Sequence, residues 1–343
     1  MAGISHRLGT AFAAAALTAS FAALADDARG LLERMEHALT SRNYQGTFVH
    51  EHDGQSETLR IIHRNEGGGF AERLVSLDGS GREVIRRDGE LRAYFPDQRV
   101  VLVESDPKAG LLFTGLQGLN SAAGQMYRLS EEAPTRISGR EARVLLVEPQ
   151  DDLRYGYRVW IDEASAMPLK TQLHTAAGRV IEQVVFTELS LPTHVADGAL
   201  QPAFSAREYR LLRHDAAGAA APQQSTDTTW DVADLPPGFR LVASSTRLMG
   251  DNHRAVTHLV FSDGLASVSV FVEPQSRLPA NRQRDPAPPT LTRVGSASAA
   301  STDVDGHRVT AIGEVPPDTV RAIAGSLRPG FAPGARSGGG GHH

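Results

Sequence analysis

Histidines around residues 50 to 63 form the pattern in this sequence that comes nearest to a metal site. His50 and His52 are two residues apart, and His63 lies on the next apolar stretch. Asp53-Gly54 between them is typical of a two-residue hairpin turn, which predicts that residue 52 pairs with 55, 50 with 57 and 44 with 63. His50 and His52 then share a face, while His63 lies at the far end of the ladder, so the three cannot converge on one ion. A two-histidine site would need a third ligand from elsewhere, and exposed or partly buried histidines are the simpler interpretation.

Glycine, serine and acidic motifs also lack the spacing that catalysis requires. Gly79-Ser80-Gly81 lies at a predicted hairpin tip and lacks the G-x-S-x-G spacing of a nucleophile elbow. Gly67-Gly68-Gly69 lies between strands, so it predicts no phosphate loop. Asp26-Asp27 and Asp151-Asp152 fall at a helix start and in a loop, where capping and solvation explain them better than acid–base work. We therefore predict no catalytic residue, no metal and no cofactor, and we favour binding over catalysis.

Length, charge and cysteine content restrict the class of protein further. The chain has 343 residues, enough for two domains with sizeable cores. Its net charge of −5 indicates no nucleic-acid partner. It contains no cysteine, which excludes disulfides, thiolate metal sites, cysteine nucleophiles and a lipid-modified cysteine anchor.

The N-terminal segment is typical of a secretory signal peptide. Arg7 precedes an apolar, alanine-rich run, and Ala23-Leu24-Ala25 fits the small-x-small cleavage pattern before Asp26. A membrane anchor is the alternative, but an exit of small residues followed by acidic ones favours cleavage near Ala25. We therefore expect export to the bacterial periplasm without a direct membrane anchor.

The elements that follow predict a protein that is mainly β with few helices. Apolar residues at helical spacing predict a first helix from Asp26 to about Asn43. Short strands with turn signals at steady spacing then continue to about Leu189, apart from residues 109–124, which are typical of a short helix or a loop. The prediction is an unclosed antiparallel half-barrel with a helix packed in its concave face, plus a smaller antiparallel sheet with one helix. The expected segments are a signal peptide over 1–25, a half-barrel domain over 26–212, a linker over 213–227, a small domain over 228–330 and a flexible tail over 331–343.

The predicted first hairpin has one apolar and one polar face. Tyr44, Phe48, Leu59 and Ile61 share the apolar face, and the opposite face carries residues such as Arg60. A half-barrel whose apolar concave face is only partly filled by a helix leaves a cleft for apolar ligands such as acyl chains. The alternative is that the helix and a lid around Leu112 and Phe113 fill the barrel, and that nothing binds.

Residues 155–161 form a strand with an unusual aromatic content. Period-two alternation places Tyr155, Tyr157, Val159 and Ile161 on one face, which we assign to the concave side. Trp160 points the other way and needs cover, from a loop, from the second domain or from the partner, and Arg158 could stack on it if it is left open. The predicted ligand-facing residues are Phe48, Leu59, Ile61, Leu112, Phe113, Tyr155, Tyr157, Val159 and Ile161.

Five stretches in both predicted domains together resemble the MucB/RseB family of periplasmic sigma-E regulators. They are YQGTFVHEHDG, RYGYRVWID running into MPLK, DLPPGFRL, FSDGLASVSVFVEP and GEVPPDTVRAIAGSLRP. The resemblance covers nearly the whole chain after the signal peptide, with the stretches in the right order. It implies a larger domain similar in fold to the periplasmic lipoprotein carriers. It also implies a non-catalytic regulator that binds the periplasmic part of a membrane-spanning anti-sigma factor and blocks its first proteolytic cut. Lipid or lipopolysaccharide fragments would release it.

One turn departs from the pattern of that family. A glycine is expected before LPLK, and here the turn is Glu163-Ala164-Ser165-Ala166-Met167. A positive φ is costly for alanine, so we expect a turn of a different type.

Three functions remain to be distinguished. The first is the stress regulator, which the second domain favours. The second is a periplasmic carrier of lipids or lipoproteins, and the third is an envelope hydrolase. As partner contacts we predict Trp160, Trp230, Phe239 and Phe271, although a core position is the preferred interpretation of Phe271. The ligand's identity and the oligomeric state, including a homo-oligomer, stay open.

Overall fold

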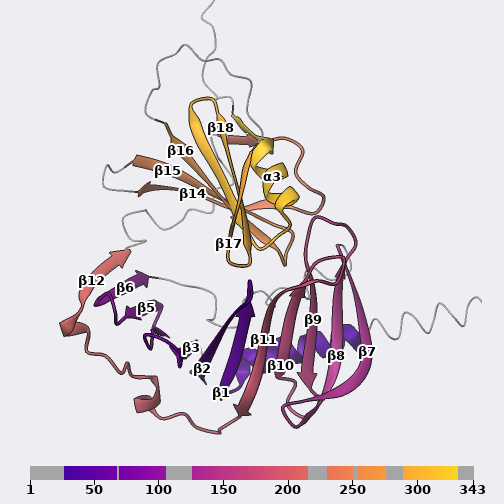
Figure 1. Cartoon of the computed structure of the whole chain (residues 1–343), viewed down its shortest axis with the longest axis vertical. Helices are drawn as coiled ribbons and strands as arrows, with labels where there is room; N and C mark the ends of the chain where they lie inside the picture. The colour runs from indigo at the N-terminus through magenta and orange to yellow at the C-terminus, as the bar shows by residue number, and fades with distance from the viewer. Residues whose placement is uncertain are drawn as a thin grey trace, which may run out of the picture. The chain divides into compact units, whose positions relative to one another are not determined.

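The computed structural model describes residues 27–67, 69–105, 126–214, 230–249, 254–275 and 289–330. The chain divides into two compact units, Met1–Ala216 and Ala217–His343 (Figure 1). Among the described residues, no helix has both the length and the apolarity to cross a membrane. The segment boundaries expected from the sequence stay predictions.

The first unit is built on one unclosed sheet of twelve strands. Their order is β12-β6-β5-β4-β3-β2-β1-β11-β10-β9-β8-β7, so nearly every strand pairs with its neighbour in sequence. All pairs are antiparallel except β12 and β6, which run parallel. The strands are β1 (Tyr44–His52), β2 (Gln55–Asn65), β3 (Phe70–Ser76), β4 (Glu83–Arg87), β5 (Glu90–Phe95), β6 (Val100–Ser105), β7 (Tyr127–Ile137), β8 (Arg140–Pro149), β9 (Gly156–Asp162), β10 (Pro168–His174), β11 (Val180–Ser190) and β12 (Arg210–His214).

The register of the first hairpin is the one that the Asp53-Gly54 turn predicts. Residue 52 pairs with 55, 50 with 57 and 44 with 63. Asp53 and Gly54 both have positive φ, as a tight hairpin turn requires. The apolar face is also confirmed, because Tyr44, Phe48, Leu59 and Ile61 are all buried.

A helix over residues 27–41 fills part of the concave face of this sheet. Figure 1 shows it running behind the half of the sheet that contains β11 to β7. Polar contacts help to hold it there: Arg143 of β8 donates to Asp27 at 2.7 Å, and Asn65 of β2 donates to the carbonyl of Thr40 at 2.8 Å. Its apolar stripe is buried, as the helical spacing predicts: Ala28, Leu31, Leu32, Met35 and Leu39.

The opposite, convex face of β2 to β6 is covered by the crossover segment, residues 191–209, which joins β11 to β12. It contains two short 3-10 helices, η2 (Asp197–Leu200) and η3 (Ala206–Glu208). Val195 and Leu200 pack on Ile62 and Ala71, and Phe204 and Tyr209 pack on a second cluster around Tyr94. The face of the first hairpin that the sequence predicts to be polar is therefore partly covered, because Val195 and Leu200 pack on Ile62 of β2.

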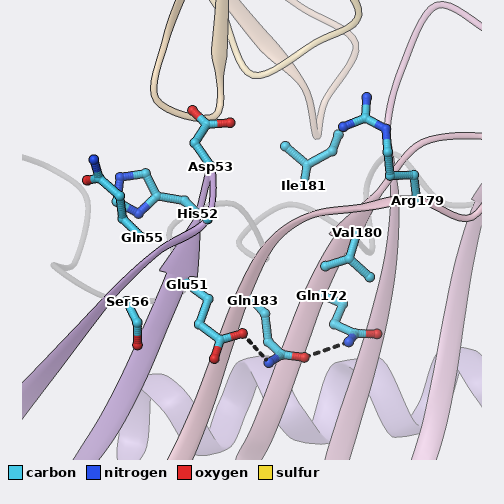
Figure 2. Close-up of a pocket in the computed structure, with 11 residues that line it drawn as sticks. Glu51, His52, Asp53, Gln55, Ser56, Gln172, Arg179, Val180, Ile181 and Gln183 are labelled. Carbon is cyan, nitrogen blue, oxygen red and sulfur yellow. Dashed lines mark hydrogen bonds between the residues drawn. The ribbon is translucent and has the colours of Figure 1, made fainter.

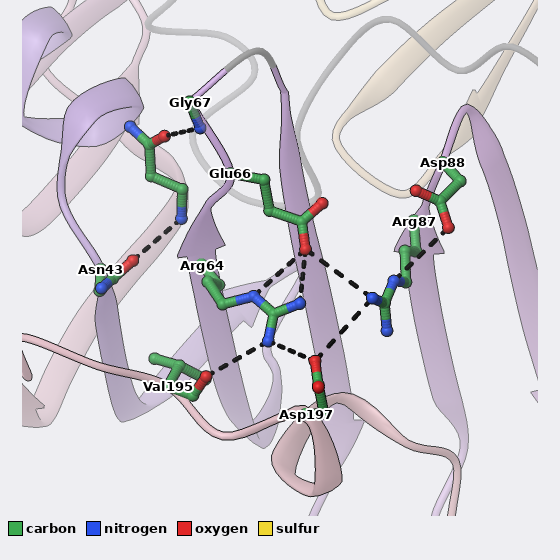
Figure 3. A network of polar contacts seen from close by, with 9 residues as sticks. Asn43, Arg64, Glu66, Gly67, Arg87, Asp88, Val195 and Asp197 are labelled. Atoms are coloured by element: carbon green, nitrogen blue, oxygen red, sulfur yellow. Dashed lines mark hydrogen bonds and ion pairs between the residues drawn. The ribbon is translucent and has the colours of Figure 1, made fainter.

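A network of charges fastens the crossover segment at one point (Figure 3). Arg64 donates to Asp197 at 2.7 Å and to the carbonyl of Val195 at 3.3 Å, and it also bonds to Glu66. The hydrogen bonds that Arg64 donates to Glu66 and Asp197 raise the pKa of Arg64, and Arg64 lowers the pKa of Asp197. Since Asp197 is largely exposed, these contacts position the segment more than they stabilise the fold.

The second unit contains a six-stranded antiparallel sheet with the order β14-β15-β16-β19-β18-β17. Helix α3 (Pro317–Ser326) packs on β18 and β19, and proline stands at its start as predicted. The core includes Leu259, Phe261, Val270 and Ile323. The strands are β13 (Trp230–Val232), β14 (Arg240–Met249), β15 (Arg254–Ser262), β16 (Ser267–Pro274), β17 (Thr290–Val294), β18 (Ala297–Val304), β19 (His307–Gly313) and β20 (Leu327–Pro329), and β13 pairs with β20 apart from the main sheet.

The turn between β9 and β10 contradicts the expectation of a different turn type. Ala166 has a φ of 60°, the left-handed region that favours glycine. The local bonding offsets this strain: the carboxylate of Asp162 accepts from the backbone N–H of Ser165 at 3.0 Å and from Arg140 at 3.2 Å. Met167, which follows, is completely buried and anchors the turn.

Candidate functional site

The predicted ligand-facing residues gather on one face of the sheet, as the alternation indicates. Phe48 pairs in register with Leu59 and Phe186, and the rings of Phe48 and Phe186 meet edge to face at 5.6 Å. Val159 and Ile161 are 0% exposed. These residues therefore serve as core on the concave side in this structure, and a ligand would have to displace something to reach them.

Four other predicted ligand-facing residues differ from that group, two in their surroundings and two because the structure does not describe them. Tyr155 is buried with Leu173 and Ile181, and Tyr157 is half-buried at the side of the same cluster. Leu112 and Phe113 lie outside the described residues.

A row of apolar side chains on the same face is the part of the concave surface that remains partly open. Residues paired directly across neighbouring strands lie side by side on one face of a sheet. Leu74, Val84 and Leu102 are half-buried, whereas Leu212 at the sheet edge is 42% exposed. We call this set the apolar row; in register order it is Ile61, Leu74, Val84, Ala93, Leu102 and Leu212.

The apolar row grades from core to surface. Ile61 is 0% exposed on the strand where Asn65 holds the helix, and Ala93 in the middle of the row is also buried, at 7%. Leu74, Val84 and Leu102 are half-buried, and Leu212 at the β12 end is the most exposed. Such a graded, partly open apolar strip is suited to an acyl chain, because covering it removes apolar surface from water. Of this row only Ile61 was predicted from the sequence, although pairing the successive hairpins as for the first one would have aligned Leu74, Val84, Ala93 and Leu102 with it.

A buried polar cluster lies beside the apolar row, around the pair His63 and Glu72, which is two residues along β2 and β3 from the pair Ile61 and Leu74. His63 Nδ1 and Glu72 Oε1 are 2.9 Å apart and both side chains are nearly inaccessible to solvent. The ring of Tyr44 stacks on His63 at 4.4 Å, and the guanidinium of Arg86 lies 4.1 Å from the ring of Phe70. Burial, with Glu72 nearby, raises the pKa of Tyr44 well above its usual value. His63 therefore belongs to an internal packing cluster.

The other two histidines lie together at the far end of the hairpin. The rings of His50 and His52 stack at 4.9 Å, and His50 Nε2 is 3.0 Å from Glu182. Among the described residues, no group of three or more metal-ligating side chains converges.

A polar pocket of about 600 Å³ opens near the tips of the β1–β2 and β10–β11 hairpins (Figure 2). At its floor Gln172 donates to Gln183 at 2.6 Å, and Gln183 donates to Glu51 at 3.0 Å. Asp53 and Arg179 stand at its rim. Its lining is mainly polar and carries both signs of charge, so it fits water and small polar groups better than an acyl chain.

Trp160 lies on the convex face, as predicted, and is only 8% exposed. It packs on Val144 and Leu169, and two cations cover its ring: Lys170 Nζ at 4.6 Å and the Arg158 guanidinium at 5.9 Å from its centroid. Burial lowers the pKa of Lys170, Glu51 opposes that shift, and Arg158 adds to it. The cover that Trp160 requires is thus supplied within the first unit, so Trp160 is not left open for Arg158 alone to stack on.

The aromatic residues chosen as partner contacts in the second unit are not alike. Trp230 and Phe239 are buried in its core, so the exposure assumed for them is wrong and we no longer propose them as contacts. Phe271 is half-buried on the other face of the sheet, where it stacks on His258 at 4.6 Å. A core position for Phe271 is therefore wrong, and a partner contact there stays a prediction.

This fold and its partly open apolar face define a two-domain β protein whose larger domain is a half-barrel suited to binding. The chain belongs to the MucB/RseB family: residues 27–204 match the model of the MucB/RseB N-terminal domain, and residues 224–328 match that of the C-terminal domain.

Relatives of known name and structure agree with this assignment. The chain is 33% identical over 306 residues to the sigma factor AlgU regulatory protein MucB of Pseudomonas aeruginosa, covering 89% of this chain and 92% of that protein. It is 29% identical to the sigma-E factor regulatory protein RseB of Salmonella typhimurium, covering 92% and 95%. The solved Pseudomonas aeruginosa MucA/MucB complex contains a chain that matches with a TM-score of 0.69 and 30% identity, covering 89% of this chain and all of that one.

Proposed function

We propose that this protein is a periplasmic negative regulator of an envelope-stress sigma factor. It binds the periplasmic segment of a membrane-spanning anti-sigma factor and shields that segment from proteolysis. The observation that carries the proposal is family membership through both domains. In addition, relatives are named as sigma factor regulators, and one solved MucB is in complex with MucA(peri).

The signal for release in this proposal is a lipid or lipopolysaccharide fragment that places an acyl chain on the apolar row. The half-buried state of Leu74, Val84 and Leu102 supports this, because a ligand there would cover apolar surface without unfolding the core. The regulator acts by occlusion and not by catalysis. The N-terminal residues 1–25 direct export and are removed.

The test combines partner binding with protection. The protein from residue 26 onward is titrated calorimetrically into the recombinant periplasmic segment of the anti-sigma factor from the same genome. The same complex is then exposed to a site-specific protease that cuts this segment. We expect 1:1 binding and slower cutting, both reversed by added lipopolysaccharide. Absence of binding by the full protein would refute the regulator.

A periplasmic carrier of lipids or lipoproteins is the second candidate, because the apolar row alone would satisfy it. A carrier transfers its ligand to an acceptor, whereas a regulator needs only to bind it. Transfer of a radiolabelled acylated peptide between vesicle populations, without any affinity for the anti-sigma segment, would favour the carrier. In the regulator, the lipid and the anti-sigma segment weaken each other's binding by the same factor, because the coupling between two binding sites is reciprocal.

A further inference from the structure

The two edges of the twelve-stranded sheet differ in their capacity to pair with another strand. The edge strand β7 contains Pro134 and a bulge between Glu132 and Thr135, and most of its residues are polar. Proline, bulges and charges are the usual protection of a sheet edge against unwanted pairing. The other edge, β12, has the sequence RLLRH and pairs regularly with β6 over all five residues. No further strand of the described residues lies beyond it.

Strand β12 also exposes apolar side chains on both faces of the sheet. Leu211 is 44% and Leu212 is 42% exposed. Leu212 continues the apolar row on the concave face, next to Leu102. Leu211 pairs with Val101, a member of the cluster beneath Phe204 and Tyr209 on the convex face. Apolar residues on both faces are typical of a strand inside a sheet, yet β12 is at the edge.

We propose that β12 is a docking strand that takes an extended, apolar and acidic peptide by strand addition. This inference rests on the proposed function and identifies the peptide as part of the anti-sigma factor's periplasmic segment. Backbone hydrogen bonds to the side of β12 away from β6, where no strand of the described residues pairs, supply the pairing, and adjacent apolar side chains of the peptide cover Leu211 and Leu212.

The charges around β12 determine which occupant fits. The strand itself has Arg210, Arg213 and His214 and no acidic residue. Arg99 and Arg207 are exposed nearby, and the backbone N–H of Arg210 donates to the carbonyl of Arg99 at 2.8 Å. Glu104 and Glu208 only partly offset these cations. The surface therefore favours acidic residues in the peptide.

A second copy of this chain is a poor occupant for the same reason. Two-fold antiparallel pairing centred on Leu212 would place Arg210 opposite His214 and Leu211 opposite Arg213 of the other copy. The two strands would together carry four arginines and no carboxylate, and this accumulation of positive charge opposes self-pairing.

The experiment compares the wild-type protein with the double variant Leu211→Lys/Leu212→Lys. Matched controls are Leu77→Lys, at a site that is 52% exposed elsewhere in the first unit, and Leu291→Lys, which is 36% exposed on the edge strand β17 of the second unit. The affinity of each for the recombinant anti-sigma segment is measured by calorimetry. Amide hydrogen exchange of residues 210–214 is followed with and without the segment, and circular dichroism shows that each variant is folded.

We expect the double variant to lose at least about tenfold in affinity. The controls should bind like the wild type, and amide exchange in β12 should slow on binding. Equal affinity of the double variant, or unchanged exchange in β12, would overturn the docking strand while leaving the regulator intact. A concentration-dependent wild-type dimer that the double variant abolishes would instead assign β12 to self-association. If the wild type does not bind the segment at all, the proposed function fails and the docking strand fails with it.

Discussion

Two kinds of concave-face residue should respond in opposite ways to truncation. Phe48 is 2% exposed and lies edge to face with Phe186 at 5.6 Å. Its replacement by alanine should lower the free energy of unfolding by about 3–5 kcal/mol, because a cavity is left where the ring was. About 0.5–1.5 kcal/mol of this loss comes from the lost contact between the rings of Phe48 and Phe186. Since small domains are stable by only about 5–15 kcal/mol, Phe48→Ala should remain folded but fragile.

The double variant Leu74→Ser/Leu102→Ser tests the open part of the same face. Each leucine is already half-buried, so an acyl chain can cover only the remaining half of the side chain. Full burial of a leucine contributes about 1.5–3 kcal/mol, which leaves about 1 kcal/mol per residue for the ligand. The double variant should therefore lose about 2 kcal/mol of binding free energy, or roughly 30-fold in affinity.

Urea unfolding followed by circular dichroism and displacement of a fluorescent apolar probe by lipopolysaccharide separate the two effects. Phe48→Ala should shift the unfolding midpoint strongly and keep its affinity for lipopolysaccharide at temperatures where it is folded. The double variant should show the reverse. If folded Phe48→Ala loses more affinity than the double variant, the ligand lies beneath the helix and the assignment of the apolar row is wrong.

Three further comparisons test how the fold is held together. Replacing Trp160, buried beneath Lys170, by alanine should lower the free energy of unfolding in urea by about 3–5 kcal/mol. Lys170→Met should be nearly neutral, because the desolvation of the lysine offsets its cation–π contact. An equal loss of stability in both variants would contradict this account. Burial raises the folded-state pKa of Tyr44 above its unfolded value of 10.0. The stability that the neutral phenol contributes is therefore complete below pH 10.0 and falls as pH rises toward the folded pKa. Above pH 10.0 the free energy of unfolding of Tyr44→Phe should decline less than that of the wild type. A Cβ on Gly46 would lie 2.3 Å from the carbonyl oxygen of Glu188, so Gly46→Ala should lower the free energy of unfolding by about 1–3 kcal/mol. A Cβ on Gly69 would have no atom within 4 Å, so Gly69→Ala should leave the thermal midpoint unchanged.

Local signals in the sequence were sufficient for the elements that are close in the chain. The Asp53-Gly54 turn determines the register of the first hairpin, and period-two alternation correctly separates Val159 from Trp160. The same signals explain why the sheet could be foreseen as a meander, since nearly all of its strands pair with sequence neighbours.

Features that depend on distant segments could not be predicted in the same way. The crossover segment covers the convex face only because Val195, Leu200 and Phe204 reach strands that are more than a hundred residues earlier. Strand β12 returns to pair with β6 in parallel, which no turn signal announces. The positive φ of Ala166 was rejected from its residue type alone, whereas the bonds to Asp162 that offset the strain involve Arg140 on another strand.

The apolar row and the docking strand share one residue, and this connects the two proposals. Leu212 ends the row on the concave face and is also one of the two exposed leucines of β12. A peptide strand added to β12 would bury Leu212 and close the open end of the row, so an acyl chain that reaches this end would compete with it. Because only the last position is shared, a short acyl chain confined to Leu74 and Val84 would leave the peptide in place. Antagonism between lipid and partner should therefore depend on how far along the row the ligand extends, and the coupling free energy would be the same whichever of the two ligands binds first.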